Sequence, residues 1–165
     1  MTIEENGTIE NFQIIACLTS FFLFLLGAKL QFSKKRLDQS AVSLFFSMVP
    51  FVGAGREASF GAVLGISGNQ LIYTKYLLAL FLVIVLSLSL AFLITAYRRR
   101  ELHWRLALLG YNFLFFAFLV IVFAQILEKG QLGFPKNQNF EELLELLGYS
   151  LLAYLSFYRL KSARE

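Results

Sequence analysis

Long uncharged apolar stretches are the feature that most constrains this sequence. Residues 77–97 and 106–127 contain no charged side chain, and each is long enough to cross the hydrocarbon core of a bilayer, which takes about 20 residues in a helix. Backbone N–H and C=O groups find no water in that core, so only helices or closed barrels cross it. The stretches lack the polar–apolar alternation of a barrel strand. They therefore predict membrane-spanning helices.

The composition excludes an ordinary soluble domain. Of the 165 residues, 58% are apolar and 16% are charged, with a mean hydropathy of +0.65. A soluble domain is about 45–50% apolar and about 25% charged. A chain of this size with so little polar surface does not dissolve as a monomer. We expect residues 1–165 to form a single transmembrane domain, because the length allows one domain.

The predicted fold class is all-α, a polytopic transmembrane helical bundle. We expect about five spans, near residues 12–30, 41–66, 75–97, 106–127 and 140–160. The second segment is the least regular, because it carries Pro50, Arg56 and Glu57 and is rich in glycine towards its end. It is either one long kinked helix or a membrane helix followed by a part that lies in the interface.

The distribution of charge predicts the orientation. Five crossings with the N-terminus outside put 11 of the 15 basic residues on the cytoplasmic side, where Lys and Arg normally accumulate. If the second segment were re-entrant, the two basic clusters would lie on opposite sides. We therefore expect an outer N-terminus and a cytoplasmic C-terminus. The clusters are interpreted as topology determinants that contact anionic lipid headgroups, and no nucleic-acid partner is expected. Their residues are Lys34, Lys35, Arg36, Arg98, Arg99 and Arg100.

The supply of cysteine and histidine limits the chemistry. The chain has one Cys, Cys17, and one His, His103, so an intrachain disulfide, a zinc site built from His and Cys, and a haem held by two histidines are all excluded. Cys17 lies in an apolar run, where a thiol packs as a hydrophobic group. The sequence contains no Walker-type loop and no Gly-x-Ser-x-Gly motif. No catalytic residue and no metal ligand is assigned, and the cofactor is left open.

Five polar residues form a candidate site because ionisable groups at membrane depth are costly and often functional. On the five-span topology they all lie near the outer surface, and we expect Arg56 to pair with Glu145 or with Glu141. The simplest interpretation is a purely structural one, a turn-rich outer connection with a structural ion pair. The alternatives are a ligand-binding or catalytic site and a contact with a partner subunit. The five residues are Arg56, Glu57, Ser59, Glu141 and Glu145.

Two short motifs carry a resemblance. The stretch from Gly55 to Gly61, Gly-Arg-Glu-Ala-Ser-Phe-Gly, resembles a motif of small uncharacterised bacterial membrane proteins, in which an acidic pair or Arg-Glu is followed by Ser, an aromatic residue and Gly. The Glu-rich run from Phe140 to Gly148 is similar to their C-terminal pattern. Together with the size and topology of the chain, the resemblance predicts a bacterial inner (plasma) membrane location. It implies no particular activity.

Two functions fit these observations. The first is a non-catalytic accessory or scaffold subunit of a larger membrane complex, or a homo-oligomer, because the chain has almost no soluble part. The second is a membrane-embedded enzyme or small-solute carrier that uses the outer Arg/Glu residues as its cavity. The expected partners are membrane lipids and either other membrane-protein subunits or further copies of the chain.

Overall fold

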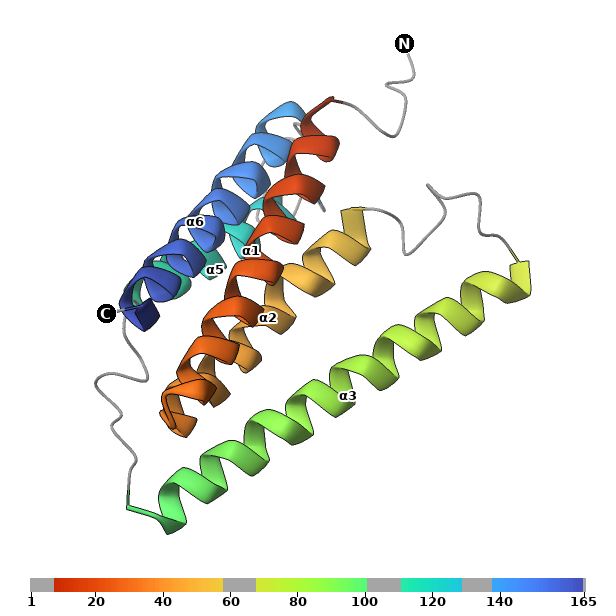
Figure 1. Cartoon of the computed structure of the whole chain (residues 1–165). Helices are drawn as coiled ribbons and strands as arrows, with labels where there is room; N and C mark the ends of the chain where they lie inside the picture. The colour runs from red at the N-terminus through yellow and green to blue at the C-terminus, as the bar shows by residue number, and fades with distance from the viewer. Residues whose placement is uncertain (1–7, 58–67, 101–110, 129–137, 165) are drawn as a thin grey trace.

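Every described residue range of the chain is built around helices. The structure, a computed structural model, describes residues 8–57, 68–100, 111–128 and 138–164. Each of the five predicted segments falls at least partly on one of the helices in these ranges. The helices are α1 (Thr8–Ser33), α2 (Leu37–Glu57), α3 (Gly68–Arg98), α5 (Tyr111–Glu128) and α6 (Gln138–Arg164) (Figure 1).

The irregular second segment is helical over most of its length. Helix α2 continues through Pro50 and ends at Glu57. The remainder of the segment, residues 58–66, lies outside the described residues, so its two alternatives both stand.

Three of the described helices are long and apolar enough to cross a membrane, as is typical of an integral membrane protein. The stretches are Ile9–Ser33, Leu37–Arg56 and Asn69–Arg98. Helix α5 contributes a shorter apolar stretch, Asn112–Leu127. Helix α6 does not qualify by composition, because charged side chains lie near both of its ends.

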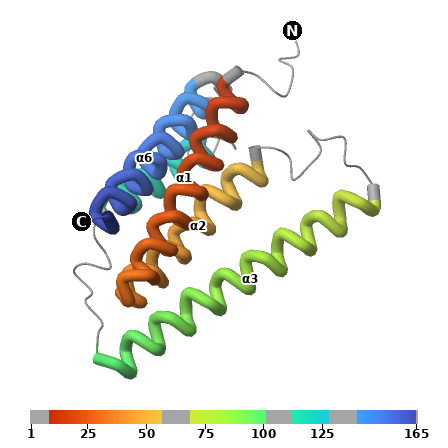
Figure 2. Tube along the Cα trace, viewed as in Figure 1, coloured from red at the N-terminus to blue at the C-terminus, as the bar shows by residue number. Residues whose placement is uncertain are grey.

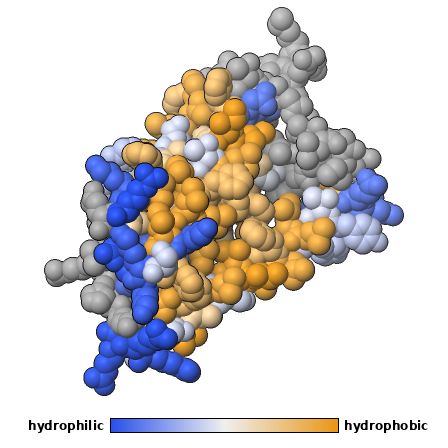
Figure 3. All heavy atoms as spheres, viewed as in Figure 1, coloured by the Kyte–Doolittle hydropathy of each residue, from blue (hydrophilic) through white to orange (hydrophobic). Residues whose placement is uncertain are grey.

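The helices run in alternating directions along the chain (Figure 2). Among the described residues, α3 packs on α2, α2 on α1, α1 on α6 and α6 on α5. We call the end of the molecule with Thr8, Glu57 and Gln138 the acidic end. The opposite end, with Ser33, Leu37 and Arg164, is the basic end. Figure 3 shows hydrophilic side chains gathered at the basic end, a smaller group at the other end and apolar side chains between them.

Helix α6 follows α1 from one end to the other. At the acidic end the Gln13 Nε2 donates to the backbone oxygen of Glu142 at 2.8 Å. At the basic end the Lys34 Nζ donates to the backbone oxygen of Arg164 at 2.9 Å. Helix α6 therefore extends along α1 over nearly the full length of both helices.

Both predicted basic clusters lie at the basic end, where α1 and α3 finish. Lys35 and Arg100 adopt left-handed backbone conformations, with φ of 60° and 57°. The Lys35 N–H donates to Phe32 O and the Arg36 N–H to Gln31 O, which is the hydrogen-bond pattern that commonly ends a helix. Glycine adopts this conformation more readily than other residues. The sequence thus keeps basic side chains where the backbone favours glycine.

Small residues allow the helices to approach closely in the core. One buried cluster joins Cys17, Ala54, Ala117, Tyr149 and Leu152, with Cys17 fully buried. Gly148 faces α5, and a Cβ added there would lie 2.5 Å from Ile121 Cγ1. A Cβ added at Gly27 would lie 3.9 Å from its nearest neighbour, which is ordinary contact. The α5–α6 contact therefore depends on the missing side chain at Gly148.

We expect Gly148→Ala to destabilise the protein relative to Gly27→Ala by about 2 kcal/mol, because a new clash opposes the entropy gained when alanine replaces a helical glycine. Both variants gain the same helix propensity, so Gly27→Ala is the matched control. The free energy of unfolding in detergent, measured for both variants, checks this expectation. Equal stability would contradict the close α5–α6 approach.

Candidate functional site

A part-buried ion pair joins α2 to α6. The Arg56 Nη2 donates to Glu145 Oε1, and the Gln125 Nε2 of α5 donates to the same oxygen at 2.8 Å. The pairing of Arg56 with Glu145, one of the two partners expected from the sequence, is present. The Glu145 side chain is 3% exposed and that of Arg56 36%. One carboxylate oxygen thus ties three helices together at the acidic end, and we call these residues the Arg56 cluster.

The local sequence places these charges favourably. Arg56 lies in the last turn of α2 and Glu141 in the first turn of α6. A helix carries partial negative charge at its C-terminus and partial positive charge at its N-terminus, so both side chains are stabilised where they stand. Glu145 lies one turn further into α6, where the dipole gives little help. The hydrogen bonds that its carboxylate accepts from Arg56 and Gln125 stabilise it there instead.

The other predicted site residues are only partly described. Glu141 is buried one turn before Glu145. Glu57 is the last residue of α2, and its side chain lies outside what the structure describes, as does Ser59 altogether. Gln13 of α1 is buried at the α1–α6 contact, and its Oε1 has no hydrogen-bond partner among the described residues. The structure therefore brings together Arg56 and Glu145 and adds Gln125, which the sequence analysis did not select.

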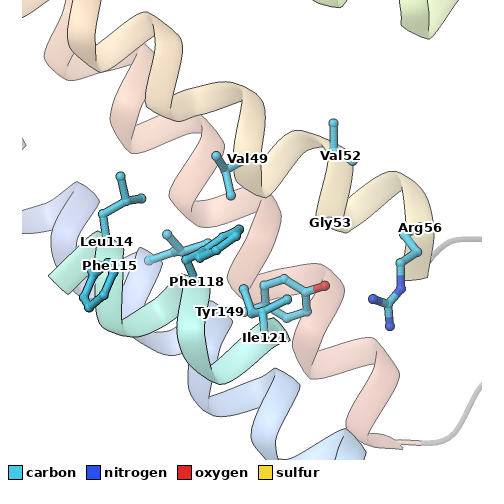
Figure 4. Close-up of a pocket in the computed structure, with 10 residues that line it drawn as sticks. Val49, Val52, Gly53, Arg56, Leu114, Phe115, Phe118, Ile121 and Tyr149 are labelled. Carbon is cyan, nitrogen blue, oxygen red and sulfur yellow. The ribbon is translucent and has the colours of Figure 1, made fainter. Parts of the chain in front are cut away.

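A cavity of about 490 Å³ lies beside the Arg56 cluster. Helices α2 and α5 have no Cα atoms within 8 Å of each other among the described residues, and the cavity lies between them with α6 alongside. Its walls are apolar except at one end, where the Arg56 guanidinium and the Tyr149 hydroxyl lie (Figure 4). The lining residues are Val49, Val52, Gly53, Arg56, Leu114, Phe115, Phe118, Ile121, Tyr149 and Leu152.

Gly53 holds the Tyr149 ring at the cavity wall. A Cβ added at Gly53 would lie 2.9 Å from Tyr149 Cε1 and 3.1 Å from Cys17 Sγ. The ring thus packs directly on the α2 backbone and closes one wall. Tyr149 is buried, with 3% of its surface exposed, so the position of its hydroxyl is set by packing. Glycine at position 53 therefore allows the close approach of α6 to the α2 backbone.

A second polar cluster lies towards the basic end and was not selected from the sequence. The Arg159 Nε donates to Ser43 Oγ at 3.3 Å, and Ser43 Oγ donates to Gln31 Oε1 at 2.8 Å. Asp38 attracts Arg159 electrostatically, and the guanidinium lies 5.5 Å from the centroid of the Phe46 ring, a favourable cation–π distance. We call Gln31, Asp38, Ser43 and Arg159 the Arg159 cluster; all four are buried.

The sequence contained a signal for this second cluster. Ser40, Ser43 and Ser47 recur at helical spacing in an apolar segment, and all three are buried. Such a stripe marks a helix face that contacts other helices, since hydroxyl groups in lipid need partners. Ser40 Oγ indeed donates to Ala28 O of α1 at 2.9 Å. Arg159 is one of the 11 basic residues expected on the cytoplasmic side, and its position near the end of the last apolar run does not by itself predict that it is buried.

The described residues contain no group of three or more His, Cys, Asp or Glu side chains arranged to hold a metal ion. No protein-family model, curated protein or solved structure matches the chain. The function is therefore inferred from the geometry of the cavity, the polar clusters and the exposed helix faces.

We expect Arg56→Met to lower the free energy of unfolding by about 2–4 kcal/mol, because it leaves the Glu145 carboxylate buried with Gln125 as its remaining hydrogen-bond donor from the cluster. The double variant Arg56→Met/Glu145→Met is expected to recover most of that loss. Lys161→Met, at an exposed site, is the control and should change stability by less than about 0.5 kcal/mol. Strictly additive effects at positions 56 and 145 would contradict the coupling.

Proposed function

We propose that the protein is a non-catalytic integral membrane protein that serves as an accessory or scaffold subunit of a larger membrane assembly. The proposal includes five crossings, an outer N-terminus, a cytoplasmic C-terminus and a bacterial inner (plasma) membrane location. The observation that carries it is the exposure of α3, the longest helix that the structure describes.

The apolar surface of α3 is left almost entirely uncovered. In α3, 11% of the most apolar stretch is buried, compared with 39% of that stretch in α1 and 61% in α2. The contacts of α3 lie along one side. Its Ser89 Oγ donates to Ala41 O of α2 at 2.8 Å, and Phe92 stacks on Phe32 of α1 with centroids 5.3 Å apart. The remaining surface is apolar along its length and is suited to lipid or to helices of another chain.

Three observations support the five-span orientation. The described helices alternate in direction, so consecutive connections fall at opposite ends (Figure 1). Helix α6 accompanies α1 from the acidic to the basic end through hydrogen bonds near both helix termini. The clusters Lys34–Arg36 and Arg98–Arg100 lie at the same end, as expected when Lys and Arg gather on the cytoplasmic side.

The alternative is a membrane-embedded enzyme or small-solute carrier that uses the Arg/Glu residues. The Arg56–Glu145 pair and the neighbouring cavity support this alternative. The cavity is apolar except near Arg56 and Tyr149, whereas passage of a polar solute requires polar groups through the bilayer. The geometry therefore favours the assembly role over transport of polar solutes.

Native mass spectrometry of the tagged protein, extracted from its own membrane in a mild detergent, tests the assembly role. We expect a complex of fixed stoichiometry with other membrane-protein chains. A triple alanine variant truncates side chains on one exposed face of α3: Leu80→Ala/Ile84→Ala/Leu88→Ala. This variant should release the partner and leave the protein folded. The matched control, Ile15→Ala/Phe22→Ala/Leu26→Ala on exposed α1 positions, should retain it. A lone monomer from the unmodified protein would contradict the role.

Labelling with a membrane-impermeant maleimide tests the orientation separately. Cys17 is fully buried, so the natural chain gives an unlabelled background. We expect Thr2→Cys to react in intact cells and Glu101→Cys to react only after the membrane is permeabilised. Reaction of Glu101→Cys from outside would show that the second segment does not cross.

A further inference from the structure

We propose that the cavity between α2, α5 and α6 binds an uncharged amphiphile with a flat, oxygen-bearing head and an apolar tail, of the chemical class of the membrane quinones. Its volume of about 490 Å³ lies within the range of about 300–1,000 Å³ that is typical of small-molecule sites. Binding there is independent of whether α3 packs on another chain.

The distribution of polar groups along the cavity sets the direction of the ligand. The Arg56 guanidinium and the Tyr149 hydroxyl lie at one end, while Leu114 and Phe115 lie at the other (Figure 4). Arg56 is one residue from the end of α2, so the polar end is at the edge of the apolar zone. An amphiphile placed with its head at Arg56 and its tail towards Leu114 has each part in a matching environment.

The charges at the polar end favour a neutral head. The positive charge of Arg56 is already matched by the Glu145 carboxylate. An anionic head would compete for Arg56 and leave Glu145, which is 3% exposed, buried without its counter-ion. Such an uncompensated buried charge is strongly unfavourable. A carbonyl or hydroxyl oxygen adds a hydrogen-bonding group without disturbing the pair.

The walls suit a flat ring. Tyr149, at the polar end, and Phe118 line the cavity, and aromatic side chains stack favourably on other rings. The Tyr149 ring packs closely on the α2 backbone at Gly53, so its place in this wall is set by packing. Phe118 is 61% exposed, which leaves its ring available for contact.

The test uses the full-length protein in a fixed concentration of mild detergent, with decylubiquinone as the probe and equilibrium binding as the readout. Val52→Trp introduces a large ring at a half-exposed cavity position and should weaken binding at least tenfold. Val83→Trp makes the same substitution at an exposed position of α3, outside the cavity. It is the control and should bind like the natural chain. Thermal unfolding without the probe should differ little among the three proteins, which shows that Val52→Trp folds.

The chemistry of the head is tested with competitors and with Tyr149→Phe. Loss of the hydroxyl should weaken decylubiquinone by about three- to tenfold, the size of one hydrogen bond, and leave the binding of decylbenzene unchanged. Equal binding of Val52→Trp and the natural chain would overturn the location. Oleate binding as tightly as the quinone would overturn the neutral head. Retention of phospholipid that decylubiquinone does not displace would overturn the ligand class.

Discussion

Side-chain hydrogen bonds between α2 and α6 set the register of these two helices, which both pack on α1. The Arg56 cluster joins the two helices near the acidic end, and the Ser43–Arg159 hydrogen bond joins them towards the basic end. Ser43 and Arg56 are 13 residues apart in α2, and Glu145 and Arg159 are 14 apart in α6. At about 1.5 Å per residue both intervals are about 20 Å. Two antiparallel helices are thus matched in register at two points.

These polar contacts act together with close helix packing, because the surroundings of the helices are apolar. In lipid an apolar side chain gains little by leaving the hydrocarbon for a neighbouring helix, so helix association depends on close packing and on hydrogen bonds between helices. Small residues at the contacts supply the close packing, as Gly53 does against Tyr149 and Gly148 against Ile121. Polar side chains then select one register among many that are similarly apolar.

The cavity lies where two of these helices are not packed directly on each other. Helix α5 packs on α6, and none of its described Cα atoms lies within 8 Å of one in α2. A cavity with mainly apolar walls lies between α2 and α5, with Arg56 and Tyr149 at one end. The Arg56 cluster links α5 through Gln125 at that end only. The uncovered face of α3 and the cavity are therefore two separate surfaces, one suited to a helix of another chain and one to a small amphiphile.

The sequence by itself determined the helices, their approximate limits and the gathering of basic residues at one end, because uncharged runs of this length have few options in hydrocarbon. It also reduced the partner of Arg56 to Glu141 or Glu145. Only the tertiary structure chose Glu145, added Gln125 and revealed the Arg159 cluster. The hydrogen bonds in these two clusters join residues 12 to 116 positions apart, and they depend on how each helix is rotated about its axis. Hydrophobic periodicity does not predict that rotation when nearly every face of a helix is apolar.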